Sequence, residues 1–276
     1  MLFTSNLFYS QKDTLSVLNN VQVYDFTVKD CLRNLKYGGK MRKDSLKPSN
    51  VLRGERVWRT IDLENKTNKL IFNKNSNCTQ VGLFEVIKFG LFEKQRNAFS
   101  SDDFNEVAKS RLTIEELKTI IQFRDTLVQT VFDANGSEAS KTTLVNRYLF
   151  NEDVRSYVLK EDWFISTKSG QMERKIIGIA PLVYDKRVGK LLPLFWLYYD
   201  EWVELFNSFE GRNYLSNSLI SYRTVLEKNY FFSQISKENN IFDRSIKSYK
   251  HGKDPSIESE IIKEKIYNSE RDLFQY

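Results

Sequence analysis

The chain has 276 residues, of which 41% are hydrophobic and 28% are charged, with 4 Pro and 11 Gly. This composition is typical of a globular protein of one or two domains, and it excludes collagen-like, largely disordered and small disulfide-scaffold proteins. One His and two Cys, far apart in sequence, are too few for a structural or catalytic zinc site, so we expect no metal and no cofactor. No run of eighteen apolar residues occurs, and the sequence predicts no membrane-spanning helix.

Positive charge is concentrated in the N-terminal quarter. The chain carries 42 Lys and Arg against 36 Asp and Glu, a formal net charge of +6, and segment 33–59 holds nine basic and two acidic residues. Such a segment suits the phosphates of a nucleic acid, with Tyr37 and Trp58 stacking on bases. It equally suits an acidic protein surface or anionic lipid head groups. The absence of a nucleic-acid-binding signature favours these last two partners.

We divide the chain into three parts. Residues 1–11 are apolar, and we interpret them as the remnant of a signal peptide that lacks its basic start. Residues 12–56 show little periodicity and predict a basic, loosely structured N-terminal arm. Residues 57–276 are predicted to form a single α+β domain. A disulfide between Cys31 and Cys78 would join the arm to this domain, and the sequence leaves open whether it forms.

Two helices are expected in the first half of the domain. Thr79 is the expected cap of the first helix. At Thr113 and Glu116 the residue types and their spacing form a capping box for the second helix. The apolar spacing then predicts that this second helix continues to Val131, followed by a polar loop over residues 134–143. The first helix places its apolar side chains on one face: Leu83, Phe84, Ile87 and Leu91.

An antiparallel β-meander is predicted over about residues 155–200. Its first strand alternates, with Glu161 as the one charged member of an otherwise apolar face. Turns at 168–170 and 185–190 lead to further strands at 176–180 and 194–199. The apolar members of the first strand are Tyr157, Leu159, Trp163 and Ile165.

Three helices are predicted after the meander, which makes the fold class α+β. Asp200 is the expected cap of a short helix that ends near Gly211. A longer helix is expected from about Ser218. The last helix has Asp254 as its cap and Pro255 at its first position. Its apolar side chains are expected to dock it on the body, namely Ile262, Ile266, Leu273 and Phe274.

Candidate catalytic groups are few. A nucleophilic mechanism would have to use the single His251, which lies between lysines in an ordinary exposed turn. Glu161 and Glu173 are the carboxylates that a hairpin could set 5–10 Å apart, as in a glycosidase. The simpler interpretation is that Glu161 pairs with a nearby Lys or Arg, while Asp162 and Glu173 face solvent. The sequence therefore favours a binding or scaffold role over an enzyme.

Eight short segments, in order and with agreeing spacing, resemble the GldN/PorN family of the type IX secretion and gliding machinery of Bacteroidota. The resemblance covers roughly residues 57–276, and the arm is the least similar part. The segments are 57–63 (VWRTIDL), 101–104 (SDDF), 112–116 (LTIEE), 160–164 (KEDWF), 176–181 (IIGIAP), 193–199 (PLFWLYY), 237–244 (KENNIFDR) and 258–260 (ESE).

The resemblance implies a non-enzymatic periplasmic protein, associated with the outer membrane through a lipoprotein of the GldK/PorK type. It implies self-association in a ring, contact with the periplasmic shaft of a GldM/PorM-type motor subunit, and no role for nucleic acid. The family has no catalytic or metal-binding motif to transfer. From the aromatic and charged members of the resembling segments we expect the partner-binding residues to be Trp58, Arg59, Asp62, Asp162, Trp163, Trp196 and Arg244.

Overall fold

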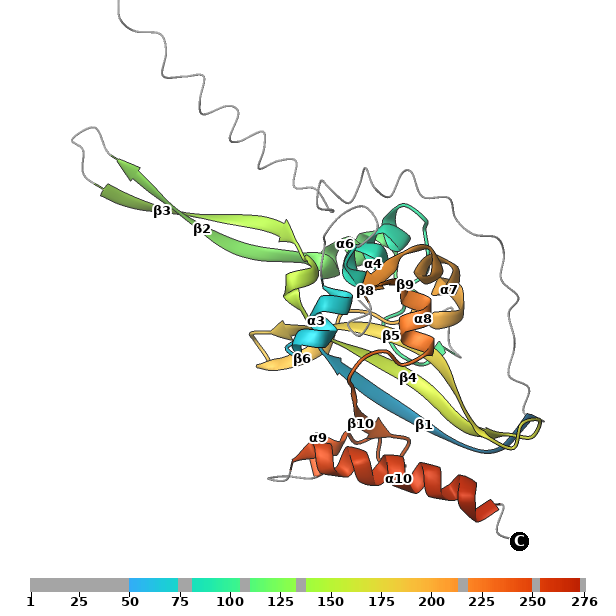
Figure 1. The fold of residues 1–276 in the computed structure, drawn as a ribbon. Coiled ribbons are helices and arrows are strands. Elements are labelled where there is room, and N and C mark those ends of the chain that lie inside the picture. The colour runs from blue at the N-terminus through green and yellow to red at the C-terminus, as the bar shows by residue number, and fades with distance from the viewer. Residues whose placement is uncertain are drawn as a thin grey trace, which may run out of the picture.

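The computed structural model describes residues 50–73, 81–104, 110–132, 138–212, 218–249 and 254–273. An antiparallel sheet of six strands, in the order β10-β1-β4-β5-β6 with β7 also paired to β5, forms the centre of the molecule (Figure 1). The predicted α+β class is confirmed. The sheet strands are β1 (Val51–Asp62), β4 (Val154–Ser166), β5 (Met172–Asp185), β6 (Lys190–Pro193), β7 (Leu197–Tyr198) and β10 (Gln234–Glu238).

The predicted meander is present as β4, β5, β6 and β7. Gly170 and Gly189 adopt φ angles of 66° and 67° in its two turns, a region that glycine enters at no steric cost. The expected strand at 194–199 is shorter, because only Leu197 and Tyr198 pair with β5. Strand β1 begins at Val51, so residues 51–56, which we assigned to the arm, form its first half.

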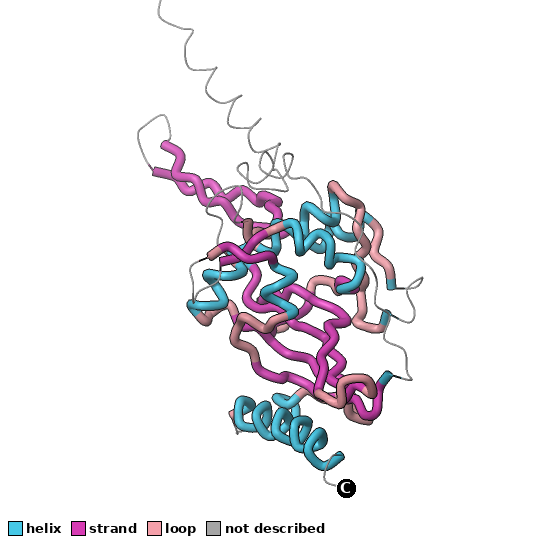
Figure 2. Tube along the Cα trace, turned by 45° about the vertical axis from the view of Figure 1, so that its right-hand side comes forward, coloured by secondary structure: helices cyan, strands magenta, loops and turns pink. Residues whose placement is uncertain are grey.

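The two faces of the sheet are covered differently. The inner face packs against helices α3 (Lys66–Phe72), α4 (Leu83–Phe92), α7 (Tyr199–Ser208) and α8 (Tyr222–Glu227) in the main hydrophobic core. At the far end of this face, α9 (Ile246–Tyr249) and α10 (Pro255–Leu273) cover a second apolar cluster that includes Val57 and Trp163. Figures 1 and 2 show α10 at one end of the molecule, with α9 beside it and apart from the helices of the main core.

The capping box of Thr113 and Glu116 is confirmed at the start of α6 (Ile114–Ile121). The predicted continuation of this helix to Val131 is wrong, because the chain leaves the helix at Gln122 and enters strand β2 (Gln122–Phe132). Four of the residues from 123 to 132 are β-branched, which favours a strand over a helix.

Strand β3 (Glu138–Tyr148) pairs with β2 in a hairpin that projects from the body (Figures 1 and 2). The expected loop at 134–143 is therefore wrong from residue 138 onward. After the hairpin, one turn of 3-10 helix, Asn151–Asp153, leads directly into β4.

The remaining helices differ mainly at their starts. Thr79 lies outside the described residues, and α4 begins after Gly82. Asp200 lies within the first turn of α7, whose N-cap is Tyr198. The long helix expected from Ser218 is wrong, because β8 (Glu210–Arg212) and β9 (Leu219–Ser221) pair first and the six-residue α8 follows with Ser221 as its cap.

The last helix begins as predicted. Asp254 precedes Pro255 and accepts a hydrogen bond from the N–H of Ser256 at 2.9 Å, as a capping aspartate does. Ile262 and Ile266 are buried against the sheet, so the predicted docking face is confirmed at these two positions.

Candidate functional site

The outer face of the sheet, opposite the main core, is the candidate functional surface. Cross-strand partners share a face, and the register pairs Arg56 with Asp162 and Trp58 with Lys160. Segment 98–104 crosses this face and pairs with the chain before β7 through Phe99, whose N–H donates to the carbonyl of Trp196 at 2.8 Å. The first turn of α7 adjoins this face through Glu201.

Trp58 is held firmly on this face. Its indole is 8% exposed and packs in one cluster with Phe99, Ala180 and Trp196. Its Nε1–H donates to Oδ2 of Asp102 at 2.7 Å. A buried indole cannot stack on a base, so the structure contradicts the expectation that Trp58 stacks in a nucleic-acid interface. Tyr37, the second expected stacking residue, lies outside the described residues.

A β-bulge shapes the centre of the outer face. In the ladder between β4 and β5, Lys160 pairs with Gly178 but Glu161 pairs with Ile176, so Ile177 is the extra residue. Such a bulge re-aims the side chain that it inserts. Here Ile177 turns to the outer face, beside Gly178, where a Cβ would lie 2.7 Å from the ring of Phe104.

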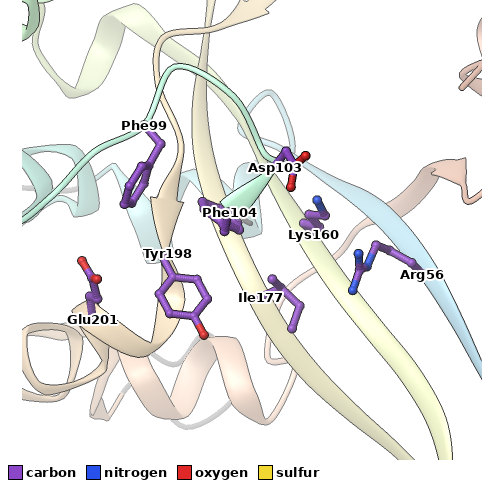
Figure 3. Close-up of a pocket in the computed structure, with 8 residues that line it drawn as sticks. All are labelled: Arg56, Phe99, Asp103, Phe104, Lys160, Ile177, Tyr198 and Glu201. Atoms are coloured by element: carbon purple, nitrogen blue, oxygen red, sulfur yellow. The ribbon is translucent and has the colours of Figure 1, made fainter. Parts of the chain in front are cut away.

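A cavity of about 370 Å³ opens at this bulge (Figure 3). The side chains of Arg56, Lys160 and Ile177 line it from the neighbouring strands β1, β4 and β5. The ring of Phe104 lies 5.2 Å from that of Tyr198, centre to centre, and forms an aromatic wall. The lining comprises Arg56, Phe99, Asp103, Phe104, Lys160, Ile177, Tyr198 and Glu201.

Both cations of the cavity are held by acidic neighbours. Arg56 donates to the two carboxylate oxygens of Asp162 at 2.6 and 2.9 Å, and this hydrogen bonding raises the pKa of Arg56. Lys160 lies 3.4 Å from a carboxylate oxygen of Asp102, although burial lowers the pKa of its ammonium group. The lining itself holds two cations, Arg56 and Lys160, and two carboxylates, Asp103 and Glu201, so its formal charges balance. Asp162 and Asp102 pair with the two cations from outside the lining.

Arg59 and Trp163 lie on the inner face and are buried around Glu161. Arg59 contacts Glu161 at 3.2 Å, Arg174 contacts it at 2.6 Å, and Nε1–H of Trp163 donates to it at 2.8 Å. Burial lowers the pKa of Arg59, while the carboxylate of Glu161 opposes that shift. These two predicted partner-binding residues therefore stabilise the interior and do not present themselves to a partner.

The pairing of Glu161 with arginine is confirmed, and the alternative catalytic pair is contradicted. Glu173 pairs across the strands with Phe164, whereas Trp163 pairs with Arg174 on the inner face. Glu161 and Glu173 therefore stand on opposite faces of the sheet, and Glu173 is exposed and accepts a hydrogen bond from Ser169 at 2.7 Å. Two such carboxylates cannot flank one glycosidic bond.

The other predicted site residues are dispersed. Trp58, Asp162 and Trp196 come together on the outer face. Asp62 is exposed at the end of β1 and accepts a hydrogen bond from the N–H of Glu64 at 2.9 Å. Arg244 lies in a turn after β10, where its guanidinium group stands over the ring of Phe242 at 4.4 Å.

Sequence reasoning missed the cavity residues Lys160, Ile177 and Tyr198. Each lies inside a segment that carried the family resemblance, but only the bulge in β5 reveals that they face one another. The sequence does contain a signal for these residues, because charged and apolar side chains occur together in strands that we otherwise interpret by their alternating pattern.

The described parts of the chain contain neither a metal-binding cluster nor a membrane-spanning helix. No group of three or more His, Cys, Asp or Glu there could hold a metal ion. Within the same ranges, every helix is too short or too polar to cross a bilayer. Cys31, Cys78 and His251 lie outside the described residues, so the disulfide and the exposed turn stay predictions.

Comparison with known proteins gives one family. The family described as gliding motility associated protein GldN matches residues 46–275, which is most of the chain. No curated protein matches the chain significantly.

Proposed function

The chain belongs to the GldN family, a component of gliding motility machinery, and on that premise we propose that it is a non-enzymatic scaffold subunit of a type IX secretion and gliding apparatus. In this proposal it works in the periplasm and forms a ring complex with an outer-membrane lipoprotein of the GldK/PorK type. It also contacts the periplasmic shaft of a GldM/PorM-type motor subunit.

The family match over residues 46–275 is the observation that carries the proposal. The separation of Glu161 and Glu173 onto opposite faces supports it, because it removes the one acid/base pair that the sequence suggested. A sheet that is covered by helices on one face and left largely open on the other also suits a subunit that docks onto neighbours.

The outer face is the surface that we assign to the partners. Its aromatic cluster around Trp58 is fixed by hydrogen bonds and packing, which limits the entropy lost on binding. Arg56 and Asp103 lie at its accessible rim and supply charges that select a partner. Of the expected partner-binding residues, Trp58, Asp162 and Trp196 support this surface from beneath.

Co-purification tests the proposal. The full chain, a GldK/PorK-type lipoprotein without its lipid and the periplasmic part of a GldM/PorM-type protein, all from one organism, are mixed in pairs, and the mass is measured by light scattering. We expect a stoichiometric complex with each partner. Arg56→Glu should weaken one of these complexes, whereas Glu260→Gln, on an exposed side chain of α10 away from the outer face, should leave both unchanged. A chain that binds neither partner would overturn the scaffold assignment.

A further inference from the structure

A tightly bonded turn over residues 240–244 follows β10. The side chain of Asn240 donates to the carbonyl oxygens of Glu238 at 3.0 Å and of Arg244 at 2.8 Å, and it accepts from the N–H of Arg244 at 2.9 Å. Asp243 adopts a φ of 51°, which is uncommon for a residue other than glycine, and forms an ion pair with Lys237. So many restraints on five residues fix the shape of the turn.

This turn holds two large apolar side chains out in the solvent. Ile241 is 98% exposed and Phe242 is 70% exposed, the two highest values among the large apolar residues that the structure describes. Arg244 stands over the ring of Phe242, and its guanidinium group forms no ion pair with any described residue. An aromatic residue and an arginine on a preformed turn are the usual anchors of a protein interface.

The turn emerges beside the cavity of the outer face. The N–H of Asn239 donates to the carbonyl oxygen of Arg56, a cavity residue, at 2.8 Å. Lys237 lies with its ammonium group 4.1 Å from the centre of the Trp58 ring, and the same group pairs with Asp243. The anchor and the cavity therefore belong to one side of the molecule.

The cavity and the turn are complementary in size and charge. A cavity of about 150 Å³ accommodates benzene, so the 370 Å³ here has room for a phenyl ring and part of a second side chain. Its apolar walls are Phe99, Phe104, Ile177 and Tyr198, and the exposed carboxylate of Asp103 in its lining suits the arginine beside the ring.

We propose that turn 240–244 of one copy of this chain docks into the outer-face cavity of a second copy, with Phe242 in the cavity and Arg244 against Asp103 at its rim. Because the turn and the cavity share one side, two copies related by a two-fold axis exchange their turns reciprocally. The contact deepens the proposed function by supplying a dimer as the building block of the ring. A two-fold contact is closed, so the ring would join such dimers through other surfaces, and the test of the contact needs the chain alone.

The first test is the mass of the chain in solution. Sedimentation of the full chain over a concentration series should show a reversible dimer. Phe242→Ser should weaken the dimer by about 30-fold or more, the size expected for an interface anchor. Val188→Ser removes an apolar side chain that is 54% exposed on the β5–β6 turn, and it should leave the dimer unchanged. A monomeric wild-type chain, or equal dimers in wild type and Phe242→Ser, would overturn the proposal.

A charge exchange tests the pairing itself. Arg244→Glu and Asp103→Arg, each alone, place like charges together and should weaken the dimer about tenfold or more. The double variant restores opposite charges and should recover most of the association. Both substituted positions are exposed, and unchanged thermal midpoints will confirm that the fold is intact. A double variant that dimerises more weakly than both single variants would contradict the assigned contact. A wild-type chain that forms the dimer but does not bind the lipoprotein would contradict only the proposed function.

Discussion

Glu161 is a carboxylate without exposed surface near the middle of the sheet, and its neighbours explain how it is tolerated there. Two arginines and one indole N–H point at its oxygens. The arginines in turn reach other elements, since Arg59 donates to Asn229 at 2.6 Å and Arg174 donates to the carbonyl oxygens of Leu226 and Glu227 at the end of α8. Through Arg174, the buried carboxylate of Glu161 thus connects the end of α8 to the sheet.

Glu161→Gln tests this role. The substitution keeps the volume but leaves the buried Arg59 and the partly buried Arg174 without their counter-charge, and breaking a buried pair costs about 3–5 kcal/mol of unfolding free energy. Urea unfolding followed by circular dichroism measures the change. Glu173→Gln, on an exposed side chain of the next strand, should stay within about 0.5 kcal/mol of wild type. Equal stability of the two variants would mean that the cluster adds nothing.

Gly90 lies where the close-packed core leaves no room for a side chain. A Cβ on Gly90 of α4 would lie 2.3 Å from the ring of Trp202 and 2.6 Å from Leu205, both in α7. Gly90→Ala gains about 1 kcal/mol of helix propensity but overpacks a filled core at a cost of about 1–3 kcal/mol. We expect the overpacking to prevail and the midpoint of thermal unfolding to fall, whereas a rise would show that α7 can move aside.

At the scale of elements, the hairpin of β2 and β3 is fixed at its root. Arg147 donates to both carboxylate oxygens of Asp153 at 2.7 and 2.8 Å, and the N–H of Phe150 donates to the same carboxylate at 2.9 Å. Below them the ammonium group of Lys88, inside the core, donates to the carbonyl oxygen of Leu149 at 3.0 Å. A projecting hairpin gains little stability by itself, so this root sets its direction.

Asp153→Asn tests the root and gives a defined pH dependence. Burial opposes ionisation of Asp153, but the hydrogen bonds from Arg147 and Phe150 prevail and lower its pKa. A lowered pKa contributes stability above the unfolded value of about 3.9, and that contribution is lost as the pH falls through the folded pKa. The variant should be less stable than wild type by about 1–2 kcal/mol at neutral pH. This difference should shrink below about pH 4. Urea unfolding between pH 3 and 7 measures it, and a constant difference would contradict the assignment.

Elements were predictable from sequence where their signals are local. The capping box of Thr113 and Glu116 acts across four residues, and Asp254 accepts the N–H of Ser256 two residues further on. Both helix starts therefore follow from the local sequence. The end of α6 was missed because apolar residues at helical spacing continue into β2, where β-branched residues and strand pairing prevail. The candidate site depended on the bulge at Ile177, and no residue pattern marks that position.

At the scale of the whole molecule, the inner face of the sheet carries two apolar clusters of unequal size, with the charged cluster of Glu161 close to both. The main core engages α3, α4, α7 and α8, whereas the second cluster engages α9 and α10 through few side chains. Besides this cluster, the hydroxyl of Ser259 accepts the N–H of Ile235 at 2.8 Å, which covers the free edge of β10. Since local stability follows the buried apolar contacts, α10 should open more readily than α4.

Hydrogen exchange of the native chain measures this hierarchy. Amides of α10 should exchange with a smaller opening free energy than those of α4, because α10 can leave without disturbing the main core. Ile262→Ala removes a side chain that is 3% exposed and should lower the protection of α10 by about 2–4 kcal/mol. The protection of α4 should change far less, since its residues pack in the other cluster. Parallel loss of protection in both helices would mean that the two clusters unfold as one unit, so that anything docked on α10 would be coupled directly to the main core.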